Sequence, residues 1–152
     1  MAQYAKTTTV STDRSRAEIE ETLERYGATC FAYMRDSEKF AVAFELRDRR
    51  IRFEVSVPTP DEYRKTNSGR RRSESSAQDA YSQALRQRWR ALVLVIKAKL
   101  ESVDSGIETF EEAFMPHLVL PNGKTVSQWL VPQIADSYAT NKMPPLLSSG
   151  NN

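Results

Sequence analysis

The sequence is short of the residues from which disulfides, metal sites and membrane spans are built. It contains one cysteine, one histidine and five glycines that are far apart in the chain. A single cysteine excludes an internal disulfide framework and a metal site of several cysteines, and isolated glycines leave no glycine-rich loop for a phosphate. The first residues lack the apolar stretch of a signal peptide, and the longest apolar run, residues 91–96, is too short to cross a bilayer. We therefore expect a protein of the cytoplasm that does not enter a membrane.

Groups that could perform catalysis are equally scarce. His117 and Cys30 would form a nucleophile–base pair only if the fold brought them together, and Cys30 lies in an apolar stretch typical of a core strand. Glu108, Glu111 and Glu112 precede His117, but their spacing matches no standard metal site. Acidic residues at the start of a helix also interact favourably with the helix dipole. We therefore expect no enzymatic activity, no metal and no cofactor.

Positive charge is concentrated in one part of the chain. The net charge is +2, but residues 64–99 carry +8, whereas residues 1–63 carry −2 and residues 100–152 carry −4. A field this local attracts a polyanion or an acidic protein surface. The ten basic residues of the segment are Arg64, Lys65, Arg70, Arg71, Arg72, Arg86, Arg88, Arg90, Lys97 and Lys99.

Hydrophobic periodicity predicts an α+β fold. Apolar residues at helical spacing predict one helix over residues 14–26 and a helix of about seven turns over residues 76–103. Between them the period changes to two, which predicts antiparallel strands over residues 29–35, 40–46 and 51–57. A small sheet with one apolar face is not stable alone, so both helices should cover it. We expect a three-stranded antiparallel sheet packed by an N-terminal helix and one long central helix, with a small helical C-terminal part.

Length and composition predict one domain, over residues 13–147. Residues 1–12 are expected to be a flexible N-terminal segment and residues 148–152 a disordered tail. The third strand should lead into a mobile basic loop over residues 61–76, which has almost no aliphatic side chains.

The C-terminal part is expected to consist of short elements. A short helix should end at Pro116, and residues 117–120 should form a strand. Thr125 is placed to cap a last helix over residues 126–138, and Pro132 should kink it or end its first half. The apolar tail that follows is expected to pack back on the surface.

Two groups of residues are candidates for the binding surface. Basic residues of the loop can bind phosphates, or they can simply keep a linker solvated. Polar residues on the side of the long helix opposite to its apolar stripe can extend that phosphate track, read base edges in a major groove, or only face water. The loop group is Arg64, Lys65, Arg70, Arg71 and Arg72, and the helix group is Gln83, Arg86, Arg90 and Lys97.

Aromatic residues are a further candidate feature, because single-stranded nucleic acid stacks its bases on exposed rings. Tyr33 and Tyr63 are the candidates for such stacking, whereas Phe44, Phe53, Trp89 and Trp129 are expected in the core. Arg88 lies near the apolar stripe of the long helix, where we expect it to extend its head to water or pair with an acidic residue of the first helix.

Three parts of the sequence carry a resemblance to known proteins. Residues 15–20 (SRAEIE), 86–92 with 96–101 (RQRWRAL, IKAKLE) and 120–126 (LPNGKTV) resemble a family of small uncharacterised proteins found in bacteriophage and prophage genomes. The resemblance implies a mobile-element protein that acts inside a bacterial cell. Small proteins of that kind tend to handle nucleic acid or block a host defence, which is an argument by analogy.

The sequence therefore predicts a non-enzymatic nucleic-acid-binding accessory protein of a phage or prophage. Its partner would be nucleic acid, with DNA favoured over RNA, bound through the loop and the helix group. The alternative is an inhibitor of a host factor. It would use the same basic surface against an acidic protein surface, or the apolar tail, residues 143–147, against a groove. The sequence leaves open whether a homo-oligomer forms.

Overall fold

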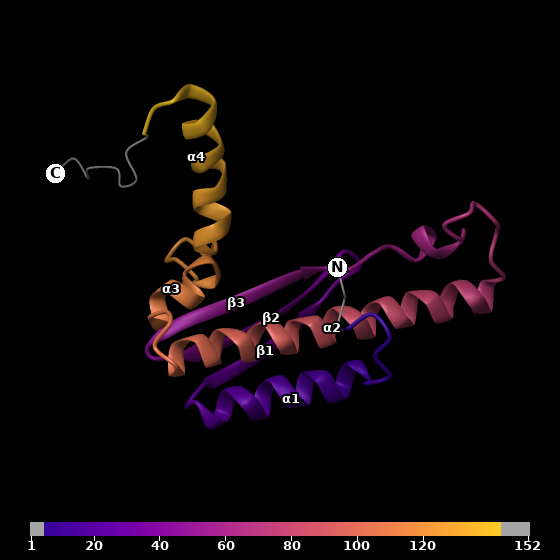
Figure 1. Ribbon diagram of the computed structural model, residues 1–152, viewed down its shortest axis with the longest axis horizontal. Coiled ribbons are helices and arrows are strands. Elements are labelled where there is room, and N and C mark those ends of the chain that lie inside the picture. The colour runs from indigo at the N-terminus through magenta and orange to yellow at the C-terminus, as the bar shows by residue number, and fades with distance from the viewer. Residues whose placement is uncertain (1–4, 144–152) are drawn as a thin grey trace.

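The computed structural model describes residues 5–143 and has an α+β fold (Figure 1). A three-stranded antiparallel sheet is combined with an N-terminal helix and a long central helix, as the periodicity predicts. The elements in chain order are α1 (Thr12–Arg25), β1 (Thr29–Arg35), β2 (Lys39–Leu46), β3 (Arg49–Ser56), the 3-10 helix η1 (Pro60–Tyr63), α2 (Glu74–Asp104), α3 (Phe110–Phe114), the 3-10 helix η2 (Met115–His117) and α4 (Val126–Thr140).

The sheet is a meander in the order β1-β2-β3. Val42 pairs with Phe53 and Phe40 with Val55, so the apolar residues of neighbouring strands share one face. The hairpin between β2 and β3 turns at Arg47 and Asp48, whose φ angles are +50° and +58°. Two consecutive positive φ angles are typical of the type I′ turn, whose twist matches that of the flanking strands.

Both helices cover the apolar face of the sheet and lie side by side on it (Figure 1). The Trp89 ring of α2 stacks on Phe40 of β2, with ring centroids 4.1 Å apart and planes 11° apart. Ile19 and Leu23 of α1 and Ile96 of α2 are also almost completely buried in this core. The alternating pattern of the strands and the helical stripe therefore meet in one apolar layer.

The ends of α1 follow local capping rules. Ser11 caps the helix by accepting a hydrogen bond from the backbone N–H of Arg14 at 3.2 Å. Gly27 follows the last turn with φ +91°, a conformation that favours glycine. α1 begins at Thr12, two residues before the predicted start, and Ser15 is fully buried inside it.

Cys30 is exposed, contrary to its predicted place in the core. The pairing of β1 with β2 is irregular between Thr29 and Ala32, and Cys30 has φ +57°. A β-bulge changes which way the side chains point, so the alternation of the sequence does not apply at this position.

The C-terminal part packs on the edge of the sheet at β3. Phe114 of α3 is fully buried and meets Phe53 edge to face, with ring centroids 6.5 Å apart. The strand predicted over residues 117–120 is reduced to isolated bridges, of which one pairs Leu118 with Ile51. Thr125 caps α4, as predicted, and α4 continues beyond Pro132 to Thr140.

None of the helices in the part of the chain that the structure describes is long and apolar enough to cross a membrane. Gln83 of α2 donates hydrogen bonds to the backbone carbonyls of Lys6 and Thr8, at 3.3 and 2.9 Å, and so holds the segment before α1. The predicted disordered tail and the end of the predicted apolar tail lie outside the described residues.

Candidate functional site

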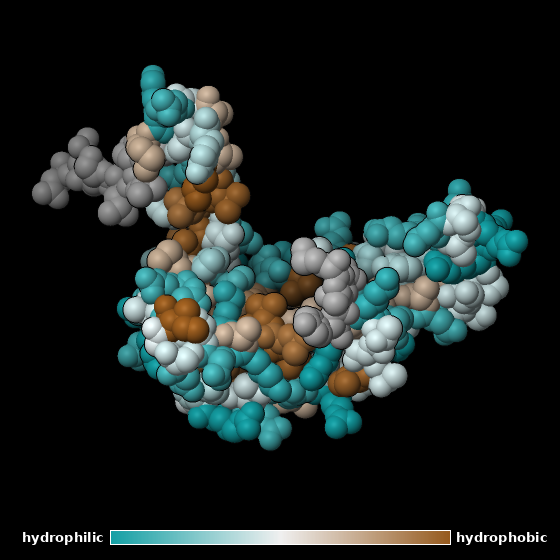
Figure 2. All heavy atoms as spheres, viewed as in Figure 1, coloured by the Kyte–Doolittle hydropathy of each residue, from teal (hydrophilic) through white to brown (hydrophobic). Residues whose placement is uncertain are grey.

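The candidate site is a basic arm, residues 60–73, that connects β3 to α2. The arm extends away from the body beside the first turns of α2 (Figure 1), at an end of the molecule that Figure 2 shows as mainly hydrophilic. Five of the nine residues 64–72 are basic, and none of residues 60–73 is buried. The sheet and the helices therefore do not use these charges to build their core.

The arm has a defined backbone path where the sequence predicts a loop. It begins with η1, where the Glu62 carboxylate accepts hydrogen bonds from the backbone N–H and the hydroxyl of Thr59, at 3.1 and 3.2 Å. A small hairpin follows, in which the Arg72 N–H donates to the Arg64 carbonyl and the Thr66 N–H to the Arg70 carbonyl, both at 2.8 Å. These bonds bring the two halves of the basic sequence together.

The five cations of the arm are held in different ways. Arg64 forms an ion pair with Asp61 at 2.8 Å, and both side chains are largely exposed. The Arg72 guanidinium donates to the carbonyls of Tyr63 and Lys65, at 3.2 and 3.0 Å, and so fastens the hairpin. The other three cations have no side-chain hydrogen bond or ion pair within residues 5–143, and they are Lys65, Arg70 and Arg71.

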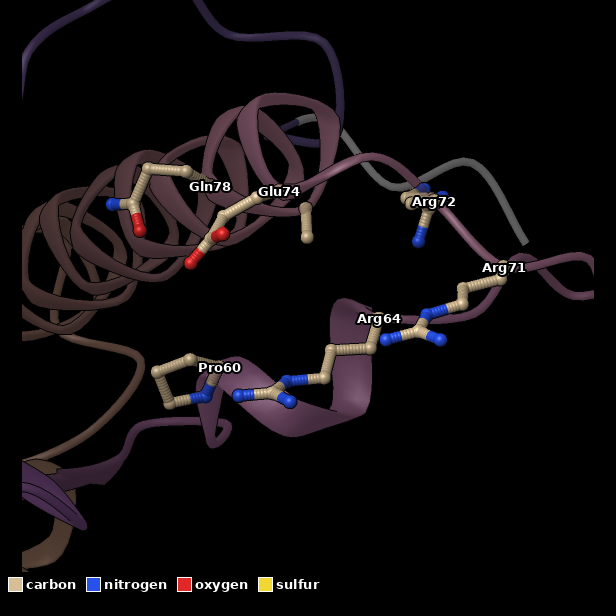
Figure 3. A pocket seen from close by; sticks show the side chains of 7 residues that line it. Pro60, Arg64, Arg71, Arg72, Glu74 and Gln78 are labelled. Atoms are coloured by element: carbon tan, nitrogen blue, oxygen red, sulfur yellow. The ribbon is translucent and has the colours of Figure 1, made fainter.

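An open cavity of about 170 Å³ lies between the arm and the start of α2. Arg64 and Arg71 border it from the arm side, and Glu74 and Gln78 border it from α2 (Figure 3). The arm side of the cavity is therefore positive, and one carboxylate lies across from it.

Two tyrosine rings and an arginine from β1 lie where the arm meets α2. Tyr63 meets Tyr81 of α2 edge to face, with ring centroids 6.2 Å apart, and partial burial raises the pKa of Tyr63. Arg35, from the end of β1, donates to the Tyr81 hydroxyl at 3.4 Å. Nothing in the sequence indicates that Arg35 joins this site, because the contact spans 46 positions along the chain.

Arg88 donates to Ser56 at 3.3 Å, so the predicted pairing with an acidic residue of the first helix is wrong.

The predicted helix group does not continue the basic surface of the arm. Arg90 and Lys97 both donate hydrogen bonds to Glu18 of α1, with 2.5 Å for Arg90. The Arg90 side chain is only 23% exposed. The hydrogen bond from Lys97, followed by that from Arg90, lowers the pKa of Glu18 against the opposing effect of burial. The prediction that these two residues lie on an open face is wrong, because α1 occupies that side of α2.

The remaining two members of the helix group also have partners inside the protein. Arg86 donates to the side-chain carbonyl of Gln83 at 2.6 Å. Gln83 uses its amide N–H groups for the backbone carbonyls before α1. The structure therefore brings together the five loop residues of the predicted site. The helix residues are held elsewhere: Arg90 and Lys97 contact α1, and Gln83, which bonds Arg86, contacts the segment before α1.

Tyr33 does not offer a free ring for stacking. Its hydroxyl donates to Glu20 of α1 at 3.1 Å, and the guanidinium of Arg16 lies 5.4 Å from its ring centroid. Burial, followed by the bond to Glu20, raises the pKa of this tyrosine. Its role is at the contact between β1 and α1.

The candidate chemical groups are dispersed. His117 stacks on Phe53 of β3 at a centroid distance of 4.0 Å, whereas Cys30 lies on β1, with β2 between the two strands. Burial, and then the charge of Lys99, lowers the pKa of His117 to about 4. Glu112 caps α3 through the Thr109 N–H at 2.7 Å. Among the described residues, no group of three histidine, cysteine or acidic side chains is arranged to hold a metal ion.

Comparison with known proteins returns no relative. No protein-family model matches the sequence, and neither a curated protein nor a solved structure matches the chain. The functional argument therefore depends on the charge and geometry of the described residues.

Proposed function

We propose that this chain is a non-enzymatic accessory protein of a phage or prophage that binds nucleic acid, with DNA favoured over RNA. The basic arm would bind backbone phosphates through Arg64, Lys65, Arg70, Arg71 and Arg72. The observation that carries the proposal is the grouping of these five cations on one projecting arm that contributes nothing to the core. The phage context is part of the proposal and comes from the resemblance described for residues 15–20, 86–101 and 120–126, whereas the binding role comes from the charge and geometry of the arm.

The interactions that the arm cations already make leave them able to bind phosphates. Lys65, Arg70 and Arg71 have no competing ion pair among the described residues, so a phosphate need not displace an internal partner. The arginine fork matches two phosphate oxygens at once. Arg64 would exchange its exposed pairing with Asp61, which is worth little in water, for contact with a phosphate. A projecting basic segment is also the form in which many proteins reach into a nucleic-acid groove.

The number of cations on the arm determines how strongly nucleic-acid binding should depend on salt concentration. On duplex DNA the logarithm of the binding constant falls with the logarithm of salt concentration by about 0.9 for each phosphate neutralised. The three cations without partners predict a slope of about −3, and all five predict about −4.5. The helix residues held by Glu18 are not counted.

A salt-dependent binding titration tests the proposal. Fluorescently labelled single-stranded and double-stranded DNA and RNA are titrated with the protein at about 50 and 200 mM salt. We expect binding to duplex DNA that weakens steeply with salt, and a weaker dependence after the triple substitution Lys65→Gln, Arg70→Gln and Arg71→Gln.

The matched control removes three exposed cations from elsewhere on the body: Arg14→Gln, Arg49→Gln and Lys124→Gln. Its net charge equals that of the arm variant, so a general charge effect would weaken both variants equally and would contradict the proposal. Absence of binding to all four nucleic acids at the lower salt concentration would also contradict it, and would favour the alternative partner, an acidic protein surface.

A further inference from the structure

A pair of tyrosine rings connects the arm to the body. Tyr63, the last residue of η1, meets Tyr81 of α2 edge to face, with ring centroids 6.2 Å apart. Tyr81 packs against the core, whereas Tyr63 belongs to the projecting arm, and both side chains are half-buried. In an edge-to-face pair each ring keeps at least one face that its partner does not cover. Tyr81 therefore holds the ring of Tyr63 in place without covering both of its faces.

Three arginines from separate parts of the chain surround the two rings, and together with them they form a tyrosine cluster. Arg35, at the end of β1, donates to the Tyr81 hydroxyl at 3.4 Å, and Arg72 of the arm donates to the Tyr63 carbonyl at 3.2 Å. Burial raises the pKa of Tyr63, and the charges of Arg88 and Arg72 act against that rise, which places both guanidinium groups near the ring. None of the three arginines forms an ion pair with a carboxylate within residues 5–143. The positive charge of the arm therefore continues onto the body around an aromatic pair.

We propose that the tyrosine cluster is a subsite for an unpaired stretch of the nucleic acid that the arm binds, with one base stacked on the ring of Tyr63. Arg35 and Arg88 would bind the phosphates that adjoin this base, because neither has a carboxylate partner to give up. The inference rests on the proposed function, since it names the kind of nucleic acid that the same surface recognises.

The composition of the cluster favours a single strand over an intact duplex. In a duplex the bases are paired and stacked on one another, so that their faces are not free for a protein ring except at the ends. Proteins that bind single strands combine a basic track along the backbone with aromatic side chains on which bases stack. A surface that bound only phosphates would need the arginines and not the rings. The arm provides the track, and Tyr63 lies at the point where the arm meets α2 (Figure 1).

Fluorescence anisotropy of a labelled single-stranded DNA of about 12 nucleotides, and of the duplex of the same sequence, tests the role of the ring. Tyr63→Leu keeps an apolar side chain and removes the ring, so it should weaken binding of the single strand by about 5- to 100-fold and leave binding of the duplex unchanged. Tyr63→Phe keeps the ring and should bind both probes as the unsubstituted chain does. The matched control Tyr138→Leu removes an exposed ring from α4, far from the arm, and should change neither affinity (Figure 1).

The salt dependence of the same titration measures the contribution of Arg35. Arg35→Gln should make the slope for the single strand shallower by about 0.7, whereas Arg49→Gln, an exposed cation at the end of β3 away from the arm, should leave the slope unchanged. Equal weakening of both probes by Tyr63→Leu, or an unchanged slope for Arg35→Gln, would overturn this inference and leave nucleic-acid binding by the arm in place. Absence of binding to both probes would overturn the proposed function and this inference together.

Discussion

Arg90 of α2 donates a hydrogen bond of 2.5 Å to Glu18 of α1. Lys97, two turns further along α2, contacts the other oxygen of the same carboxylate. One acidic side chain therefore connects two helices that both cover the sheet, and it neutralises part of the positive charge that the sequence assigns to the binding surface.

Removal of the Glu18 carboxylate should destabilise the fold. Glu18→Gln leaves the Arg90 guanidinium, which is mostly shielded from water, without its anion. We expect the free energy of unfolding to fall by about 1–2 kcal/mol, less than for a fully buried pair because the side chains are partly exposed. Urea denaturation followed by circular dichroism measures the change. Glu21→Gln, at an exposed position of the same helix, is the control and should have little effect.

The helix cations should matter for stability and not for nucleic-acid binding. We expect the double variant Arg90→Gln and Lys97→Gln to unfold at a lower urea concentration and to keep the salt slope of the unsubstituted chain. The reason is that Glu18 already occupies both cations. A slope that becomes shallower by about 2 would show instead that these residues contact phosphates.

His117 should make the fold sensitive to mild acid. Its pKa is about 4 in the folded chain and near 6.5 in an unfolded chain, so the unfolded state binds the extra proton as the pH falls from 6.5 to 4. Stability that is fully present above pH 6.5 is therefore lost across this window, by about 1–3 kcal/mol after allowance for partial exposure.

The His117→Phe variant isolates this contribution, because it keeps an aromatic ring against Phe53 and has no proton to gain. We expect the free energy of unfolding of the unsubstituted chain to fall more than that of the variant between pH 7 and pH 4.5. Parallel curves for the two proteins would contradict the assignment. Carboxylates with a lowered pKa, such as Glu18 and Glu112, affect both proteins alike.

The hairpin turn at Asp48 offers a stabilising substitution. Asp48 is exposed and has φ +58°, where glycine has no steric penalty. We expect Asp48→Gly to raise the free energy of unfolding by about 0.5–1 kcal/mol. Asp48→Ala should lower it, because alanine keeps the β-carbon and is less tolerant of a positive φ than aspartate. Thermal denaturation of the two variants gives the comparison, and the opposite order would contradict a type I′ turn.

The parts of the fold that depend on periodicity were predictable from the sequence. Phe40, Val42 and Phe44 alternate on β2 as a half-buried strand requires, and the stripe through Trp89 and Ile96 identifies α2 and its covering role. Local irregularities were not predictable. The sequence predicts the third strand from residue 51, whereas the hairpin turns at residues 47–48 and β3 begins at Arg49, because many polar residues nearby favour turns equally. The bulge at β1 is a product of pairing between strands, which no local pattern encodes.

The candidate site was predictable only in part, because local sequence patterns do not show which elements pack together. Charge density alone identifies Arg70 and Arg71, because uncompensated cations need no tertiary partner to be recognised. Helical spacing correctly places Arg90 and Lys97 away from the sheet, but it does not reveal that a second helix lies on that side. The hydrogen bonds from Arg72 to backbone carbonyls depend on the path of the backbone, and no sequence pattern predicts them.

The arm interrupts the chain between two sets of core-forming elements. Residues 5–59 supply α1 and the sheet, and residues 74–143 supply α2 and the C-terminal helices. Within the first set α1 covers only part of the apolar face of the sheet, α2 from the second set covers the rest, and the segment between the two sets supplies no buried residue. Two polypeptides divided within the arm should consequently reassemble on mixing, so that this protein could serve as a pair of complementing fragments whose reunion restores the folded body without a covalent link.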